Sequence, residues 1–487
     1  MRRRHFLADS GFGFAGLAAS TMLACDGVVK AGTQPPHHGS HFTPAAKSVI
    51  WIFLSGGYSH METFDPKPAL TQYAGKTYAD TPWPNPVESP LHKKRFRSVP
   101  AAEINIRDVY PTIYPMQVGF RKHGQSGIEI TDWWPHLAEC VDDISFVRNM
   151  WTTDNDHAAE NQIHTGRHRL DETQPSIGAW AHYGLGSIND NLPRFVVLGG
   201  PTRTDTRASI DSNYLGPEHA GVPLKLDPSN PLAFGRRQPG QSALQQQQEF
   251  DLISRLNQLT AEEFPRDAQL EARIRSYELA FRMQAAVPEA VDLTKETAAT
   301  RQSYGIGVQH TETAARRLLA ARRMVERGVR FVQVFPSPYG KWDSHQELKK
   351  NHSKMCLSVD RPVAALLKDL KQRGLWNDVA VVFCTEFGRT PGLEERSGGT
   401  TGRDHHPNGF TIWMAGAGIK QGFVHGATDE LGYHALGDGH YVTDLHATVL
   451  HLLGLDNTKL EVPGRKRLDI DRGAVIGDIL TNSPRVV

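Results

Sequence analysis

Chemically reactive side chains gather in two stretches of the sequence, CTEFGRTP (384–391) and GRDHHPNGF (402–410). Together they supply Glu386, Arg389, Arg403, Asp404, His405 and His406. Adjacent ionisable groups are costly to bury without a partner such as a metal ion. Arginines beside a metal would bind the oxygens of a sulfate or phosphate group through paired contacts. These residue types therefore indicate a metal and an oxyanion.

Three further polar segments each follow an apolar run of strand length. They are SGGYSHMETFDPKP (55–68), WTTDNDHAAENQIHTGRHR (151–169) and SPYGKWDSH (337–345). In the last segment Asp343 and His345 flank one residue, so an extended backbone points both side chains the same way, as two metal ligands require. In the first segment His60 follows a Gly-Gly pair, which lets the backbone approach a ligand closely.

Each of these groups also has a purely structural interpretation. Glu386 can pair with Arg389 or cap the following helix, and Asp156 can N-cap the helix that starts at His157. The Gly-Gly pair fits a tight turn, and the segment around Asp343 fits a polar loop anchored by a tryptophan. The arginines fit ordinary surface charges. The residues alone leave both interpretations open.

Six continuous apolar runs of strand length are spread along the chain. They cover 47–54, 144–150, 194–200, 329–336, 379–386 and 410–418. Runs buried on both faces are typical of a parallel sheet with helices on each side. Helical patterns cover 313–328, 359–374 and 442–455, the first two ending at a glycine and the last starting near Thr443. This alternation predicts a doubly wound α/β sheet, with the polar segments at its carboxyl edge, where ligands bind.

The N-terminus has the pattern of a targeting segment. Residues 1–24 carry the pair Arg3 and Arg4, followed by a short apolar run, as in a twin-arginine export signal. An imperfect lipobox precedes Cys25, which makes that residue a candidate for a lipid anchor. The sequence thus predicts export to the periplasm, either free or as a membrane-anchored lipoprotein. The alternative is a basic tail with a chance apolar stretch.

The rest of the chain is expected to form one domain. Residues 25–46 have the composition of a flexible linker, and the domain covers 47–487. Within it, 235–310 is polar and favours helix, which predicts a helical insertion over the sheet. The stretch 71–125 is rich in proline and aromatic residues and is expected to form long surface loops.

The composition fits a globular protein and narrows the function classes. The chain has 487 residues, of which 39% are apolar and 22% charged, and its net charge is +1. This balance gives no indication of nucleic-acid binding. The 23 histidines favour metal chemistry. Four cysteines show neither metal-type spacing nor a disulfide framework.

Several of these motifs resemble those of a known protein family. GGYSHMETFDPKP, KWDSH, TEFGRTP, GRDHH, HGATDELGYHA and TDLHATVLHLLGLD resemble the successive motifs of a bacterial family called domain of unknown function 1501. The resemblance runs from about Lys47 to Asp456. That family is similar in fold to the sulfatases and alkaline phosphatases. It implies an alkaline-phosphatase-like three-layer α/β/α sandwich with a mainly parallel sheet, and metal-assisted hydrolysis of sulfate or phosphate esters.

The likeness to sulfatases implies positions for catalytic residues. Where sulfatases have Thr-Gly-Arg the chain has a matching motif ending in Arg167, and counting back by the sulfatase spacing places Asp156 at the nucleophile position. No cysteine or serine stands there, so formylglycine chemistry is excluded at that site. Direct attack by a metal-activated water is expected, with Asp156, His157 and Arg389 as catalytic residues. Thr152 and Thr153 are the alternative nucleophiles.

Motif and resemblance together give a candidate site. The metal ligands are expected to be Asp343, His345, Glu386, Asp404, His405 and His60, and the residues expected to contact the anion are Arg389, Arg167, Arg403 and His406. Mixed histidine and carboxylate ligands favour zinc or manganese over calcium as the divalent metal.

Two function classes are consistent with these features. The first is an exported metal-dependent hydrolase of anionic esters, such as a sulfated or phosphorylated glycan. The second is a non-catalytic exported protein that binds an anionic glycan or a partner protein through the same cleft. The dense histidine and carboxylate cluster favours the first, and the missing nucleophile favours the second.

Overall fold

The structure is a computed structural model, and only part of the chain is described here. The described residues are 39–91, 110–168, 170–189, 191–201, 204–232, 242–263, 281–283, 286–396, 399–465, 467–468 and 472–481. The predicted export signal, with Arg3, Arg4 and Cys25, lies outside these ranges, so export and lipidation stay predictions.

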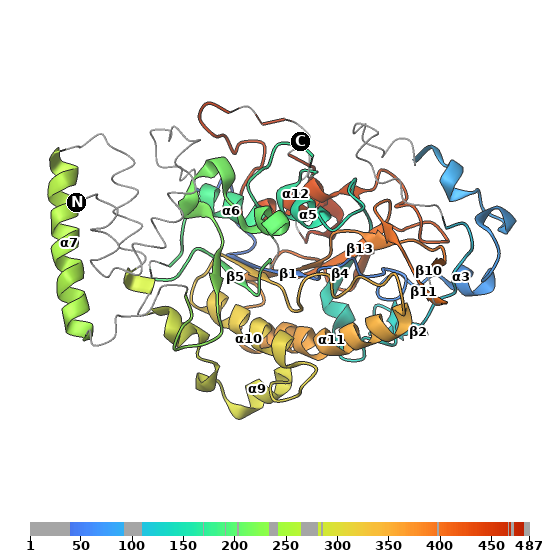
Figure 1. Ribbon diagram of the computed structural model, residues 1–487, viewed down its shortest axis with the longest axis horizontal. Helices are drawn as coiled ribbons and strands as arrows, with labels where there is room; N and C mark the ends of the chain where they lie inside the picture. The colour runs from blue at the N-terminus through green and yellow to red at the C-terminus, as the bar shows by residue number, and fades with distance from the viewer. Residues whose placement is uncertain are drawn as a thin grey trace.

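A large central sheet crosses the described part of the molecule (Figure 1). Its strands run in the order β14-β4-β13-β8-β1-β7-β5-β6, and β15 also pairs with β4. Their bounds are β1 Ser48–Phe53, β4 Ile144–Trp151, β5 Phe195–Leu198, β6 Val222–Leu224, β7 Phe331–Val334, β8 Val379–Cys384, β13 Phe410–Gly416, β14 Phe423–His425 and β15 His440–Tyr441. Each of the six predicted strands corresponds to one of these.

All pairings in this sheet are parallel except those of β13, which runs antiparallel to both β8 and β4. The carboxyl ends of β1, β4, β7 and β8 therefore meet at one edge. Because β13 is reversed, its amino end lies at the same edge. The segment 402–410 lies at that edge because it precedes β13 in the chain. The other polar segments lie there because each of them follows a strand.

Helices cover both faces of the sheet (Figure 1). One face carries α10 (Glu312–Glu326) and α11 (Leu348–Gln372), with α9 (Ala298–Tyr304) beneath them. The other face carries α5 (Ala159–Thr165), α6 (Ile177–Leu185) and α12 (Val442–Leu452). The prediction of a three-layer α/β/α sandwich with a mainly parallel sheet is confirmed.

The central strand β1 explains why both layers form. Alternate residues of a strand point to opposite faces, and every residue of β1 is buried. Ile50 and Ile52 belong to the core that contains α10 and α11, whereas Val49, Trp51 and Phe53 belong to the core that contains α6 and α12. The uninterrupted apolar run in the sequence is thus the signature of a strand covered on two sides.

Smaller elements surround the sheet. They are α3 Pro68–Gln72, β2 Phe120–His123, β3 Ile128–Thr131, α7 Ala243–Glu263, β9 Gly388–Arg389, β10 Glu394–Arg396, β11 Thr400–Gly402 and β12 His405–His406. The helix α7 lies within the predicted insertion, of which 235–241, 264–280 and 284–285 are outside the described residues. Among the described residues, none of the helices has the length and apolar character needed to span a bilayer.

Two helix starts differ from the prediction. The helix α11 begins at Leu348, eleven positions before the predicted start at 359, and it carries Pro362 in its interior. Asp360 does not cap this helix, because its carboxylate accepts the backbone N–H groups of His136 and Leu137. The N-cap of α12 is Tyr441, so the predicted cap Thr443 is already helical.

Candidate metal centre

Four side chains from three places in the fold meet at the carboxyl edge of the sheet. Asp343 and His345 follow β7, and His157 lies between β4 and α5. His405 comes from β12, a short strand that pairs with β9 so that His405 lies opposite Arg389. We call His157, Asp343, His345 and His405 the Asp343 cluster.

Three ligand-type atoms form a nearly equilateral triangle in this cluster. The Oδ1 atom of Asp343 lies 3.2 Å from the Nε2 atoms of both His345 and His405, and these two nitrogens are 3.1 Å apart. On the other carboxylate oxygen, Oδ2, the Nε2 atom of His157 lies 3.1 Å away. All three histidine Nε2 atoms therefore face one carboxylate.

Oxygen atoms at Nδ1 orient each of the three rings. The Nδ1 atom of His405 faces the backbone carbonyl of Asn155 at 2.7 Å, which can only accept a hydrogen bond. A Glu394 oxygen lies 2.7 Å from Nδ1 of His345, and a Glu386 oxygen lies 3.3 Å from that of His157. We therefore assign an N–H to each Nδ1 atom.

This assignment leaves lone pairs on the Nε2 atoms of His345 and His405, facing each other and Asp343. The two Nε2 lone pairs repel unless a proton or a metal ion lies between them, whereas Oδ1 of Asp343 already accepts a hydrogen bond from the Arg389 guanidinium at 2.7 Å. Ligand atoms about 2.0 Å from a tetrahedral ion lie about 3.3 Å apart, close to the edges of the triangle. Carboxylates or carbonyls behind the rings are the usual partners of metal-binding histidines. The residues thus fit a divalent metal.

The charges around the cluster are consistent with this arrangement. Burial lowers the pKa of His405 well below its usual value, which favours the neutral ring. Burial also opposes a charge on His157, but hydrogen bonds to Asp343 and Glu386 raise its pKa to about 9. Burial alone would raise the pKa of Asp343, yet the Arg389 guanidinium and His157 hold it well below its usual range.

Two more carboxylates complete the surroundings. Asp404 accepts the backbone N–H of His405 at 2.7 Å, and the same oxygen lies 3.4 Å from Nδ1 of His345. Together with His345 and His405 it forms a second group of ligand-type atoms within 4.8 Å of one another. Glu386 accepts the backbone N–H of Gly56 at 2.7 Å and orients His157. Its oxygens therefore lie behind the His157 ring. Glu386 was predicted to be a metal ligand, but the structure does not place it in the triangle of Asp343, His345 and His405.

The two arginines nearest the cluster are fully buried. Arg389 donates to the backbone carbonyls of Gly56, Gly57 and Arg403, and to Asp343 at 2.7 Å. Arg403 forms a buried ion pair with Glu62 at 2.8 Å, and it donates to four backbone carbonyls. This burial favours a structural role for both arginines over the predicted contact with an anion.

Three other predicted residues point elsewhere. The Nε2 atom of His60 lies 2.9 Å from the carbonyl of Gly432, and that of His406 lies 2.6 Å from the carbonyl of Tyr433. His406 is adjacent to His405 in an extended segment, so the two rings leave on opposite sides. Arg167 lies 3.7 Å from Asp171. The structure does not bring these side chains into the Asp343 cluster.

The predicted catalytic segment is only partly directed at the cluster. Asp156 accepts the backbone N–H of its neighbour His157 at 2.7 Å. Thr152 donates its hydroxyl to Gln162 at 2.7 Å, and the Gln162 amide donates to the Thr153 hydroxyl at 2.6 Å. Of these residues, His157 is the one that contacts Asp343.

Sequence reasoning missed Glu394 and Asn155. Glu394 lies in the hairpin of β10 and β11, a segment without apolar periodicity, and only its contact with His345 reveals a role. Asn155 acts through its backbone carbonyl, which is common to every residue type. Neither contact leaves a signal in residue type or spacing.

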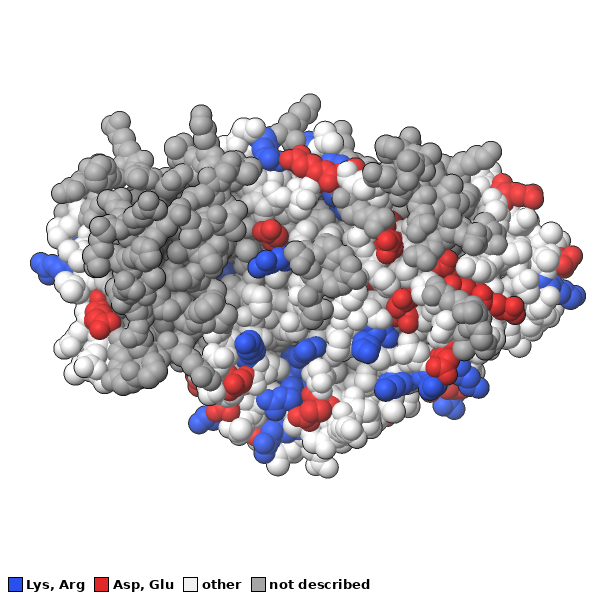
Figure 2. Space-filling view, in the orientation of Figure 1, with Lys and Arg blue, Asp and Glu red and all other residues white. Residues whose placement is uncertain are grey.

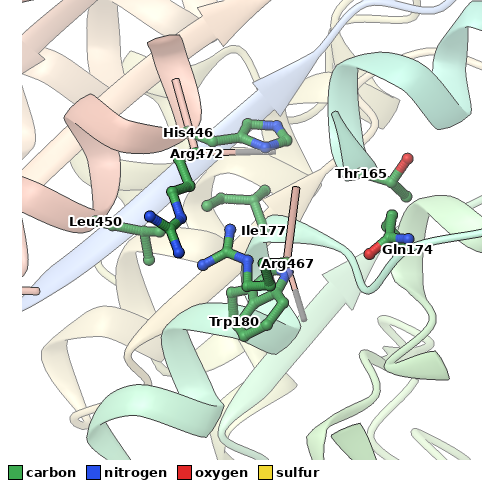
Figure 3. A pocket seen from close by; sticks show the side chains of 8 residues that line it. All are labelled: Thr165, Gln174, Ile177, Trp180, His446, Leu450, Arg467 and Arg472. Atoms are coloured by element: carbon green, nitrogen blue, oxygen red, sulfur yellow. The ribbon is translucent and has the colours of Figure 1, made fainter. Parts of the chain in front are cut away.

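A small pocket lies between α5, α6 and α12, away from these residues (Figure 3). Its lining is Thr165, Gln174, Ile177, Trp180, His446, Leu450, Arg467 and Arg472. The Arg467 guanidinium lies over the Trp180 ring, 4.3 Å from its centroid, and donates to the backbone carbonyl of Asn457. Arg467 thus links the segment around Asn457 to α6. No member of the Asp343 cluster is among the residues that line this pocket.

Three solved structures that the chain resembles have low sequence identity to it. The C-terminal periplasmic domain of EcEptC from Escherichia coli, in complex with Zn, is 10% identical at a TM-score of 0.36, covering 90% of this chain and 92% of that one. PsFucS1 sulfatase from Pseudoalteromonas sp. is 11% identical at a TM-score of 0.33, covering 94% of this chain and 73% of that one. A protein in the alkaline phosphatase superfamily from Vibrio parahaemolyticus is 10% identical at a TM-score of 0.35, covering 90% of this chain and 74% of that one. No curated protein sequence matches the chain.

The family comparison covers most of the chain. Residues 46–480 match the family described as "Protein of unknown function (DUF1501)". This span includes the whole Asp343 cluster and all the motifs between Lys47 and Asp456 that carried the resemblance. The expected family is therefore confirmed, and the chain belongs to the DUF1501 family.

Proposed function

We propose that the protein is an exported metal-dependent hydrolase of sulfate or phosphate esters. The observation that supports the proposal most is the triangle of Asp343 Oδ1, His345 Nε2 and His405 Nε2, with edges of 3.1 to 3.2 Å. Three protein ligands with an open position are typical of catalytic metal sites. Two imidazoles and one carboxylate suit zinc or manganese better than calcium, which prefers oxygen ligands.

The exposure of the cluster indicates where a substrate would approach. The side chains of Asp343 and His157 are 27% and 17% exposed, whereas that of His405 is 1% exposed. The open side therefore lies at Asp343 and His157. A divalent ion bound in the triangle would supply Lewis acidity at this opening.

His157 is the proposed catalytic residue of the chain itself. Its Nε2 atom faces Asp343 and its Nδ1 atom faces Glu386, and despite burial these two carboxylates raise its pKa to about 9, which favours a proton on Nε2. A histidine oriented in this way can transfer its Nε2 proton to a leaving oxygen. Asp156 then has the role of fixing the backbone of this segment rather than acting as a nucleophile.

The alternative is a non-catalytic protein that binds an anionic glycan or a partner at the same place. The burial of Arg389 and Arg403 removes the predicted anion contacts from the surface, which among these alternatives favours binding of a partner protein. On the face shown in Figure 2, the Lys/Arg and Asp/Glu side chains of described residues are intermixed rather than separated by sign.

Elemental analysis and an ester assay together test the proposal. The exported protein is purified without chelator, its metal content is measured, and aryl sulfate and aryl phosphate are offered as substrates. We expect at least one zinc or manganese ion per chain, together with hydrolysis that is abolished in both the H405A and the H157Q variants. A folded protein without metal, or hydrolysis unaffected in both variants, would contradict the proposal.

Export is tested separately from catalysis. Replacing Arg3 and Arg4 with lysine should retain the protein in the cytoplasm, because the twin-arginine pathway reads that pair. Cell fractionation of the variant and the unmodified protein gives the answer. Unchanged periplasmic delivery of the lysine variant would exclude this route.

A further inference from the structure

A second pair of histidines lies on the β4 side of the sheet, apart from the Asp343 cluster. His425 ends β14 and His440 begins β15, and both strands pair with β4, opposite Val147 and Met150 respectively. The Nε2 atoms of the two histidines face each other at 2.8 Å. This is the same face-to-face arrangement that His345 and His405 form.

A carboxylate stands behind each ring of this pair. The Nδ1 atom of His440 lies 3.0 Å from Oδ2 of Asp444, and the Nδ1 atom of His425 lies 3.4 Å from Oδ2 of Asp478. The contact between His440 and Asp444 is a hydrogen bond, so the His440 Nδ1 atom carries an N–H and its Nε2 atom presents a lone pair. The exposed Asp478 carboxylate favours the same tautomer of His425 through its charge. The two ring side chains are 16% and 21% exposed, so an ion could reach them from solvent.

We propose that His425 and His440 bind a divalent transition-metal ion of the class that prefers imidazole, Zn²⁺ or Cu²⁺. Ligands at right angles around Cu²⁺, about 2.0 Å from it, lie about 2.8 Å apart, which is the observed separation of the two Nε2 atoms, whereas a tetrahedral Zn²⁺ requires the rings to move apart to about 3.3 Å. The carboxylate–histidine–metal arrangement is the usual one for histidine ligands. Water molecules complete the coordination, so this ion binds more weakly than one in the Asp343 triangle. The inference does not depend on the proposed hydrolase function.

The ion would join the two ends of one segment, 426–439. The middle of that segment packs behind the strand that carries His405. The carbonyl of Tyr433 lies 2.6 Å from Nε2 of His406, and the backbone N–H of Ala435 donates to the carbonyl of Asn408 at 2.9 Å. A metal that closes a loop reduces the freedom of the unfolded chain. The second ion would therefore stabilise the support of the Asp343 cluster without belonging to it.

The test compares metal binding by the full chain and by the H425Q/H440Q double variant. The exposed His310 provides a matched control in the H310Q variant. We expect equilibrium dialysis against Zn²⁺ to show one fewer ion per chain in the double variant than in the control, and at least tenfold weaker binding of that ion in each single variant. Equal stoichiometry and affinity in all variants would overturn the proposal and leave a proton shared between the two rings.

A spectroscopic measurement covers the case in which the double variant does not fold. Cu²⁺ bound by two imidazoles gives an electron paramagnetic resonance spectrum with splitting from two nitrogens. Because His345 and His405 would give the same splitting, the measurement is made in the H345A/H405A background, and there we expect the component to be present and to disappear when H425Q or H440Q is added. Persistence of that component after either addition would overturn the proposal. If the Asp343 triangle binds no ion, the H425Q/H440Q variant should still bind one ion fewer than the control. A failure of the proposed function can therefore be distinguished from a failure of this inference.

Discussion

His345 and His405 face each other through their Nε2 atoms across 3.1 Å, and the Nδ1 atom of each ring is held by an oxygen acceptor, Glu394 for one and the Asn155 carbonyl for the other. Neither ring can turn its protonated nitrogen toward its partner without losing that hydrogen bond. A metal ion satisfies both lone pairs at once. The predictions below follow from this arrangement.

Removal of His405 should abolish tight metal binding at the triangle. The H405A variant loses one of three ligands, and we expect its affinity for Zn²⁺ to fall by roughly 100-fold or more. Metal titration of the purified variant measures this loss. The H310Q variant serves as the control, and native metal content in H405A would show that the ion lies elsewhere.

Glu394 should affect metal affinity without touching the metal. Its carboxylate orients His345, so the E394Q variant is expected to bind Zn²⁺ roughly 10- to 100-fold more weakly while staying folded. The adjacent Glu395 is exposed and offers a matched control in E395Q. Equal Zn²⁺ affinity in the two variants would mean that His345 is not a ligand.

The buried pair of Arg403 and Glu62 should matter for stability rather than for anion binding. Both side chains are 0% exposed, so R403M leaves an uncompensated buried carboxylate and should lower the free energy of unfolding by about 3–5 kcal/mol. Urea unfolding checks this, and E62M/R403M should recover part of the loss. A stable R403M protein that loses inhibition by sulfate or phosphate would instead indicate substrate contact.

Asp156 and His157 should behave differently although they are neighbours. The H157Q variant is expected to keep its metal and lose hydrolysis by at least roughly 100-fold, because the proton donor is gone. The D156A variant is expected to keep both metal and most activity. Single-turnover hydrolysis with mass spectrometry of the protein adds a check: a phosphate or sulfate group on Asp156, Thr152 or Thr153 would establish covalent catalysis.

Gly56 should tolerate no side chain. Its φ is +122°, and a Cβ atom added there would overlap the backbone nitrogens of Trp342 and Asp343. We therefore expect G56A to displace Asp343 and weaken metal binding, as measured by Zn²⁺ titration. The control is G75A, because Gly75 has a φ of +77° but no heavy atom within 4 Å of the added carbon. Similar Zn²⁺ affinities in G56A and G75A would contradict this packing argument.

The sheet was predictable because its strands are buried on both faces. The continuous apolar runs of β1 and β8 carry that signal directly, and the polar residues after them fall at one edge by topology. The start of α11 was not predictable in the same way. Pro362 and Asp360 together resemble a helix start, yet Pro362 lies inside the helix and Asp360 binds backbone groups near His136.

Three residues of the Asp343 cluster could be predicted from the sequence, but the groups that orient them could not. Asp343, His345 and His405 stand out by type and spacing, and the structure brings them together. Arg389 has the same residue type whether it binds an anion or buried carbonyls, so only the fold distinguishes these roles. Which of His405 and His406 faces the cluster depends on the register of a two-residue strand, which the sequence does not specify.

The reversed strand β13 also sets an order of events during folding. It lies between β8 and β4, so until it is inserted the sheet consists of two separate halves. His405 lies in β12, a short distance before β13 in the chain. A chain that has been synthesised only as far as β8 contains Asp343 and His345 but lacks His405. If the proposed ion binds there, its retention would report that a newly made molecule has closed its sheet, and metal content would measure folding quality as well as the site.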